Sequence, residues 1–175
     1  MKTNSALILV MAFGLSSASA QVERSSNSSP RIIPTPQQVE VSSELFKLTS
    51  QTRIILGERT TAEDQFAAQQ LNIRLSEMRK TPLRIASEGS LRKVPKNILY
   101  LGSPQSSFGK RWLKARNLAL GPELKNEGYV LEAKQEEIVI LGESAVGRFY
   151  GMMTLLQLLE LQKKSVVVSG VSIRD

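Results

Sequence analysis

The segment 147–160, GRFYGMMTLLQLLE, constrains the fold of this chain more than any other stretch. On a helical wheel its apolar residues occupy nearly every side, and only Arg148, Thr154, Gln157 and Glu160 are clearly polar. A surface helix needs one apolar stripe, whereas a helix that is apolar all round must be buried. We therefore predict a helix over residues 144–161 that is covered on more than one side.

Two adjacent apolar stripes divide the predicted helix. We expect the first stripe to face the domain's own sheet and the second to face another domain, and the alternative is an ordinary core helix. Tyr150, Met153 and Gln157 share one line at i, i+3 and i+7, so they are the candidate domain interface. The first stripe is Met152, Leu155, Leu156 and Leu159; the second is Val146, Phe149, Tyr150 and Met153.

Gly147 and Gly151 stand four residues apart, which leaves one line of the helix as bare backbone. A glycine inside a helix costs about 1 kcal/mol relative to alanine. Two glycines at this spacing therefore predict the close approach of a strand or another helix.

The rest of the chain favours an α+β fold. A second long helix is expected over 61–79, where Thr60 and Glu63 fit a capping box. Extended, largely apolar segments around it predict a sheet of about five to seven strands. Among them, 96–103 is expected to be central, 127–143 to form a hairpin, and 106–120 to be loops or a short helix. The prediction is one domain over 31–175: a mixed, largely antiparallel sheet with two long helices on one face.

The first twenty residues resemble a secretory signal peptide. A positive start, an apolar run and the sequence Ala18-Ser19-Ala20 predict cleavage before Gln21. The apolar run is too short to span a bilayer, and we expect no stable membrane insertion. Residues 21–30 are polar and serine-rich and read as a flexible leader. The protein is thus expected to be secreted or periplasmic.

The absence of cysteine and histidine from the sequence limits the chemistry. It excludes disulfides, Ser-His-Asp and Cys-His catalysis, and the common zinc sites. Paired carboxylates remain the main catalytic option, but Glu63–Asp64 and Glu136–Glu137 read as solvated surface charges. We therefore assign no catalytic residue, metal or cofactor.

Positive charge is concentrated between residues 74 and 116, where eleven Lys or Arg stand against two acids, Glu77 and Glu88. A solvated rim is the favoured interpretation, and no nucleic-acid partner is expected because no nucleic-acid motif accompanies the charge. The alternative is a basic face that binds acidic glycan, as in a stand-alone secreted module.

Four segments together resemble the N-terminal domain of family 20 glycoside hydrolases, the β-N-acetylhexosaminidases. They are IIPTPQQVEV at 32–41, GYVLEA at 128–133, IVILGESAVGRFYGMMTLLQLLE at 138–160 and VSGVSIRD at 168–175. The stretch FYGMMTLLQLL is the most specific. Related domains also precede the barrels of O-GlcNAc-cleaving hydrolases and α-glucuronidases, so the resemblance defines the domain type better than the sugar.

The resemblance implies a domain that does no chemistry and packs against a (β/α)8 barrel. In the family the barrel supplies a Glu general acid and an Asp that orients the substrate's own acetamido group as nucleophile. The barrel typically opens with a segment like I-x-D-x-P-x-F-x-x-R-G, and this chain stops at Ile173-Arg174-Asp175. We therefore expect the chain to be a truncated product or fragment that is inactive alone, with the barrel as its partner in cis or in trans.

Overall fold

The computed structural model describes residues 30–91, 95–121 and 124–175. The predicted signal peptide (1–20), and the predicted leader (21–30) except its last residue, lie outside the described residues. The elements, in chain order, are β1 (Gln38–Lys47), β2 (Arg53–Leu56), α1 (Ala62–Glu77), β3 (Arg84–Ser87), the short 3-10 helix η1 (Glu88–Ser90), β4 (Ile98–Gly102), α2 (Ser107–Ala115), β5 (Val130–Lys134), β6 (Glu137–Leu141), α3 (Ala145–Leu158), β7 (Glu160–Gln162) and β8 (Ser165–Arg174).

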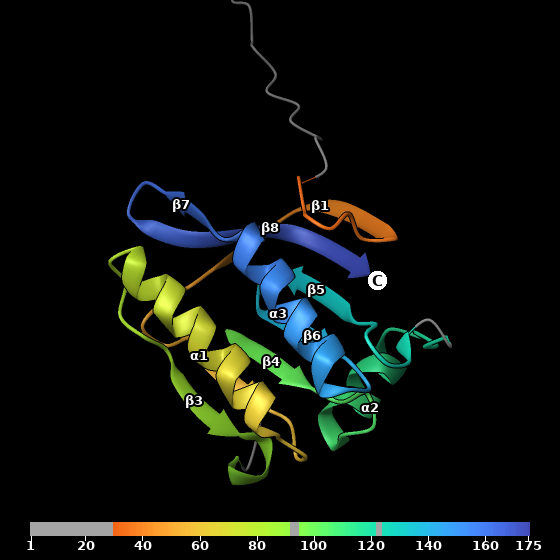
Figure 1. The fold of residues 1–175 in the computed structure, drawn as a ribbon. Coiled ribbons are helices and arrows are strands. Elements are labelled where there is room, and N and C mark those ends of the chain that lie inside the picture. Colours follow the sequence, from red (N-terminus) through yellow and green to blue (C-terminus); the bar gives the residue numbers. More distant parts are fainter. Residues whose placement is uncertain (1–29, 92–94, 122–123) are drawn as a thin grey trace, which may run out of the picture.

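One mixed sheet organises the domain, with strand order β1-β8-β5-β6-β4-β2-β3 and β7 paired to β8 (Figure 1). Strands β3, β2, β4 and β6 run parallel to one another, and we call them the parallel half. The pairings of β5 with β6 and β8, and of β8 with β1 and β7, are antiparallel, and we call β1, β5, β7 and β8 the antiparallel half. The predicted α+β class and mixed sheet are confirmed.

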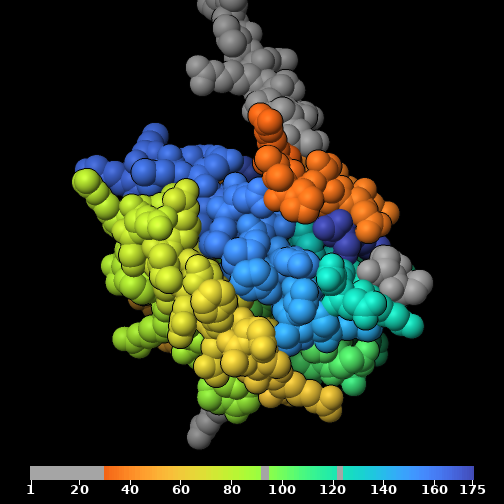
Figure 2. All heavy atoms as spheres, viewed as in Figure 1, coloured from red at the N-terminus to blue at the C-terminus, as the bar shows by residue number. Residues whose placement is uncertain are grey.

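Helices α1 and α3 lie side by side on one face of the sheet, as predicted (Figure 1). Leu71 of α1 and Leu155 of α3 are fully buried in the main core, against inward side chains such as Leu99 and Ile140. Figure 2 shows the outer surfaces of the two helices forming one face of the molecule.

Helix α2 lies on the opposite face of the sheet. It falls within residues 106–120, for which the sequence predicts either loops or a short helix. Phe108 and Trp112 of α2 pack with Tyr100 of β4 in a second, separate core. The Tyr100 and Phe108 rings stack at 4.1 Å between centroids. Strands β2, β4 and β6 of the parallel half contribute to both cores and so have protein on both faces, whereas its edge strand β3 is largely exposed.

Two local predictions need correction. The capping box of α1 is formed by Thr61 and Asp64, one residue later than Thr60 and Glu63. Helix α3 ends at Leu158, and Glu160–Gln162 form strand β7, which makes the sheet eight-stranded rather than five- to seven-stranded. Strand β7 pairs with β8, and all three of its residues are exposed. Because none of its side chains enters the core, the strand shows no apolar alternation that the sequence could reveal.

Candidate domain interface

Helix α3 buries most, but not all, of its circumference within the domain. Met152 and Leu155 are fully buried, whereas Val146 and Tyr150 are 45% and 42% exposed. Thr154, which looked polar in the sequence, is buried and shares a hydrogen bond of 2.7 Å with the hydroxyl of Tyr129. The helix therefore has a wide side against the sheet and a narrower side toward solvent.

The two glycines of α3 lie where the backbone of the helix packs closely against its neighbours. A Cβ on Gly151 would lie 2.6 Å from Cγ2 of Ile140 on β6, and one on Gly147 would lie 2.3 Å from the carbonyl oxygen of Gly128. Neither site has room for a methyl group without movement of its neighbours. The close approach expected from their spacing is confirmed, and the neighbours are β6 and the segment leading into β5.

Sequence reasoning missed the role of Arg148. This side chain is buried and forms a two-pronged ion pair with the buried Asp64 of α1: Nε to Oδ1 is 2.6 Å and Nη2 to Oδ2 is 2.9 Å. Its Nη1 donates to the carbonyl oxygens of Gly142 and Glu143 just after β6. Asp64 is thus not the solvated surface charge we expected. A single arginine within an apolar helix, together with an aspartate at another helix start, was the only signal of this pair in the sequence.

The predicted contact residues lie along the exposed side of α3. Tyr150 and Gln157 are exposed, and Met153 is half-buried. Deep burial of Tyr150 and Met153 under the domain's own strands would contradict a two-sided helix, and neither is deeply buried. Gln157 is not free, because its side-chain amide exchanges two hydrogen bonds with the backbone of Ile33.

Aromatic side chains join α1 and α3 across this outer surface. Phe66 of α1, which is 50% exposed, stacks on Phe149 of α3 at 6.1 Å, and Phe149 lies 6.1 Å from Tyr150 at a tilted angle. Phe66, Phe149 and Tyr150 form what we call the aromatic band, and Val146 lies beside it one turn before Tyr150. Phe66 and Tyr150 are exposed, whereas Phe149 is half-buried and also packs against the main core. Soluble domains seldom leave contiguous aromatic surface exposed unless it meets a partner.

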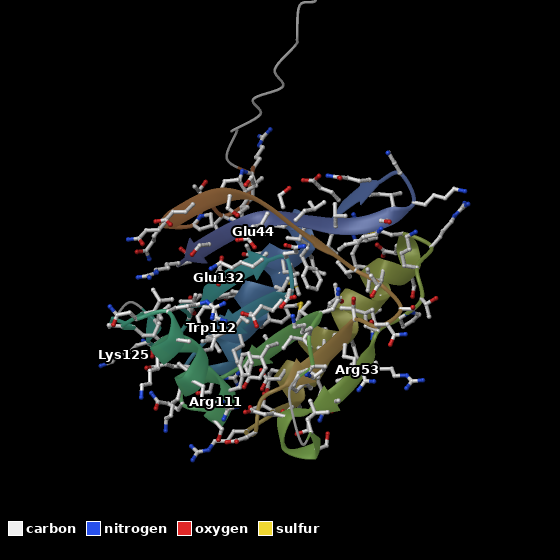
Figure 3. The ribbon with its side chains drawn as sticks, turned by 180° about the vertical axis from the view of Figure 1, so that it is seen from behind. Glu44, Arg53, Arg111, Trp112, Lys125 and Glu132 are labelled. Atoms are coloured by element: carbon white, nitrogen blue, oxygen red, sulfur yellow. The ribbon has the colours of Figure 1, made fainter. Side chains whose placement is uncertain are left out.

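The opposite face of the sheet contains a cluster of paired charges. Arg116 lies 4.2 Å over the Trp112 ring and binds two carboxylates, Glu132 (2.7 Å) and Glu137 (2.5 Å). Figure 3 shows Trp112 and Glu132 near each other on this side. Because one guanidinium already holds both carboxylates, the arrangement is structural rather than that of a free acid–base pair. Glu137 is half-buried here, which corrects its assignment as a solvated charge.

The basic residues of 74–116 do not form one continuous face among the described residues. Arg74 pairs with Glu77, Lys96 pairs with Glu136, and Arg116 points inward. Three cations of α2, Lys110, Arg111 and Lys114, are exposed and form no ion pair with any other described residue. In the described part of the chain, no helix is long and apolar enough to cross a membrane. Over the same residues, no group of three or more acidic side chains is placed to hold a metal ion.

Residues 29–175 match the family described as glycosyl hydrolase family 20, domain 2. A relative named Beta-hexosaminidase from Porphyromonas gingivalis is 32% identical over 152 residues, which cover 82% of this chain and 17% of that protein. The chain therefore spans less than a fifth of the length of this relative.

Solved structures share the fold. The GH20 β-N-acetylhexosaminidase from Streptomyces coelicolor A3(2) matches 82% of this chain and 26% of its own, with a TM-score of 0.58 and 24% identity. The structure of CpGH84B matches 83% of this chain and 22% of its own, with a TM-score of 0.57 and 26% identity. The family match, which spans all the described residues, leads to one conclusion: this chain belongs to glycosyl hydrolase family 20 as its domain 2.

Proposed function

We propose that this chain is the non-catalytic accessory domain of a secreted β-N-acetylhexosaminidase-like glycosidase, and that it packs against a (β/α)8 catalytic barrel through the outer surface of α1 and α3. The observation that carries the proposal is the exposed aromatic band. It occurs on two helices whose inner sides already fill the main core. Interfaces are enriched in such aromatic side chains.

The position of Asp175 supports the same surface. Asp175 pairs its backbone with Tyr129 and accepts a hydrogen bond from the backbone of Gln37. A shallow groove is lined by Asp175 together with Tyr150 and Pro34. A segment continuing from Asp175 would therefore begin beside the aromatic band.

The chemistry of the parent enzyme is proposed to reside outside this chain. Of the acids first weighed as catalytic, Asp64 holds Arg148, and Glu137 holds Arg116 and accepts from Trp112 Nε1 at 3.0 Å. Purified alone, the chain should not hydrolyse an aryl N-acetyl-β-glucosaminide. Turnover that is abolished by changing one of its own acids would refute the accessory role.

Docking can be tested with matched variants of α3. Met153→Asp should leave the isolated domain folded, because Met153 is only half-buried, and should weaken its association with a barrel. Leu159→Asp is the contrasting variant: Leu159 is buried in the main core, so an unpaired charge there should unfold the chain. Equal association of wild type and Met153→Asp with a barrel would remove α3 from the proposed interface.

The predicted signal peptide and secreted or periplasmic location remain part of the proposal. Expression of the whole chain in a bacterial host should release a protein that begins at Gln21. N-terminal sequencing of the periplasmic fraction checks this, and an intact Met1 would contradict it.

One observation favours a second function, the binding of acidic glycan. Helix α2 presents Lys110, Arg111 and Lys114 together, and no acid occurs in residues 103–121. No exposed aromatic ring accompanies them among the described residues, which suits a charged polymer better than bases or neutral sugars. Figure 3 shows Arg111 on this outer side. Salt-sensitive binding to an acidic polysaccharide, lost in the Arg111→Glu/Lys114→Glu variant, would support this function.

A further inference from the structure

We infer that Ile33, held in place by the side-chain amide of Gln157, is a preformed contact of this domain with the catalytic domain. The inference rests on the proposed function and deepens it, because it changes the role of one predicted contact residue. Gln157 positions the contact residue rather than making the contact itself.

The hydrogen bonds between Gln157 and Ile33 resemble those of a strand pair. The Ile33 backbone N–H donates to Oε1 of Gln157 at 3.0 Å, and Nε2 of Gln157 donates back to the Ile33 carbonyl oxygen at 3.0 Å. The same Nε2 lies 3.5 Å from the carbonyl oxygen of Met153. Strand β1 begins only at Gln38, so this amide supplies what a neighbouring strand would supply to Ile33.

The neighbours of Ile33 are also fixed. Ile32 is buried in the main core, and Pro36 is buried two residues beyond Pro34. Ile33 itself is 68% exposed, the highest exposure among the large apolar side chains described. Figure 2 shows the first part of the described chain lying against α3. The backbone around Ile33 is thus held from two sides while its side chain points to solvent.

A fixed, exposed aliphatic side chain favours a binding role. A single exposed apolar residue is ordinary, but this one adjoins the aromatic band through Pro34, which lines the same groove as Tyr150. A contact that is already ordered costs less conformational entropy when a partner binds. The catalytic domain is the occupant we infer, because the groove also contains Asp175, from which a continuing chain would reach this surface first.

A chimera tests the inference. Residues 30–175 replace the matched segment of the P. gingivalis Beta-hexosaminidase, and calorimetry records whether the two domains unfold together. We expect the unchanged chimera to cleave an aryl N-acetyl-β-glucosaminide and to unfold in one transition. We expect Ile33→Asp to split that transition in two and Ile33→Val to keep it single. We expect Gln157→Ala to separate the unfolding of the two domains to a smaller extent than Ile33→Asp.

Leu161→Asp is the matched control, since Leu161 is an exposed aliphatic residue (55%) on β7, away from the groove. It should keep the single transition. Each Asp variant is also melted as the isolated chain, and Ile33→Ser replaces Ile33→Asp if the latter does not fold. A single transition in the Ile33→Asp or Ile33→Ser chimera overturns the inference. The inference is also overturned if the only effect of the variant is that the isolated chain no longer self-associates. Two independent transitions in the unchanged chimera would instead count against the proposed function.

Discussion

The two halves of the sheet bury their side chains in different ways. In the parallel half, β4 (Ile98–Gly102) is buried at every position, with Leu99 and Leu101 in the main core and Ile98 and Tyr100 in the second core. In the antiparallel half, β5 still places Leu131 in the main core and Val130 in the second core, but Glu132, on the face of Val130, pairs with Arg116. Strand β1 of this half is exposed at most of its positions.

The difference follows from what covers each half. Parallel strands need crossover connections, and helices in those connections cover the faces of the sheet. Here α1 connects β2 to β3 and α2 lies between β4 and β5, so the parallel half acquires layers on both sides. The antiparallel strands β1, β8 and β5 need no helix to join their pairs, and one of their faces remains polar and partly solvated, with Glu40, Ser172 and Lys134 along it.

The largest effect is expected from a charge placed in the doubly covered half. Leu99→Asp would put an unpaired carboxylate into the main core from β4, where Leu99 is fully buried. The cost should exceed about 4 kcal/mol, enough to abolish cooperative folding. Circular dichroism on heating checks this, and a cooperative melt near that of the wild type would show that the parallel half is less tightly packed than described.

The second largest effect is expected from breaking the buried ion pair between Arg148 and Asp64. Arg148→Met leaves Asp64 buried without its partner and should lower the free energy of unfolding by about 3–5 kcal/mol. Combining it with Asp64→Asn removes the unpaired charge and keeps an acceptor for the Thr61 backbone, so the double variant should recover much of the loss. Denaturant titrations measure both, and equal losses in the single and double variants would contradict the pairing argument.

Gly151→Ala should destabilise the domain by about 1–3 kcal/mol, because the new methyl group would lie 2.6 Å from Ile140 Cγ2. Helix propensity alone predicts the opposite, a gain of about 1 kcal/mol. Thermal melting decides between them. The control is Gln69→Ala at an exposed position of α1, which should change stability little. A more stable Gly151→Ala variant would mean that α3 can move away from β6.

Alkaline pH should lower stability through two buried tyrosines. Burial raises the pKa of Tyr100 far above its usual value near 10, assisted by the hydrogen bond and charge of Glu88 and opposed by Ser106. Burial also raises the pKa of Tyr129. A raised folded-state pKa gives stability that is complete below about pH 10 and falls as the pH rises above it, by up to about 1.4 kcal/mol per pH unit for each tyrosine.

Tyr129→Phe tests this pH dependence without removing Tyr100 from its contacts with Glu88. The slope of unfolding free energy against pH, measured between pH 9.5 and about 11.5 by denaturant titration, should be shallower in the variant. An identical slope in both proteins would mean that Tyr129 ionises in the folded state as easily as in the unfolded one.

The smallest effect is expected on the polar face of the antiparallel half. Ser172 pairs across the sheet with Glu40 on one side and Glu132 on the other. Ser172→Lys would place a cation between two acids, and cross-strand pairs of this kind contribute about 0.2–1 kcal/mol. A change within about 0.5 kcal/mol, or a slight gain, is therefore expected from thermal melting. A loss as large as that of Arg148→Met would show that this face is as closely packed as the doubly covered half.

Several features of the fold could be predicted because they depend on neighbours in sequence. The apolar runs of β2 and β4 indicated buried strands, and the residues of 127–143 indicated the β5–β6 hairpin. The all-round apolar character of α3 indicated burial, with Tyr150 and Met153 on its outer line. The short exposed strand β7 was not predictable, since its only sheet partner is β8 and its side chains carry no pattern.

The candidate interface was predictable only in part. The line Tyr150, Met153 and Gln157 followed from helical spacing, but Phe66 joins the surface from α1 and Ile33 joins it from before β1. No periodicity connects residues 33, 66 and 150. The use of Gln157 for a backbone 124 residues away is likewise invisible along the chain.

The sequence by itself determined the class of the domain, the two long helices on one face and the family resemblance carried by residues 32–41 and 128–175, because these depend on local periodicity and contiguous motifs. Only the tertiary structure decided that Asp64 meets Arg148, that Arg116 holds Glu132 and Glu137, and that Ile33 lies on Gln157. Such pairs form where strand order and helix packing bring distant segments together. Their energies depend on burial and on distances of a few Å, and neither quantity is encoded in the spacing of residues along the chain.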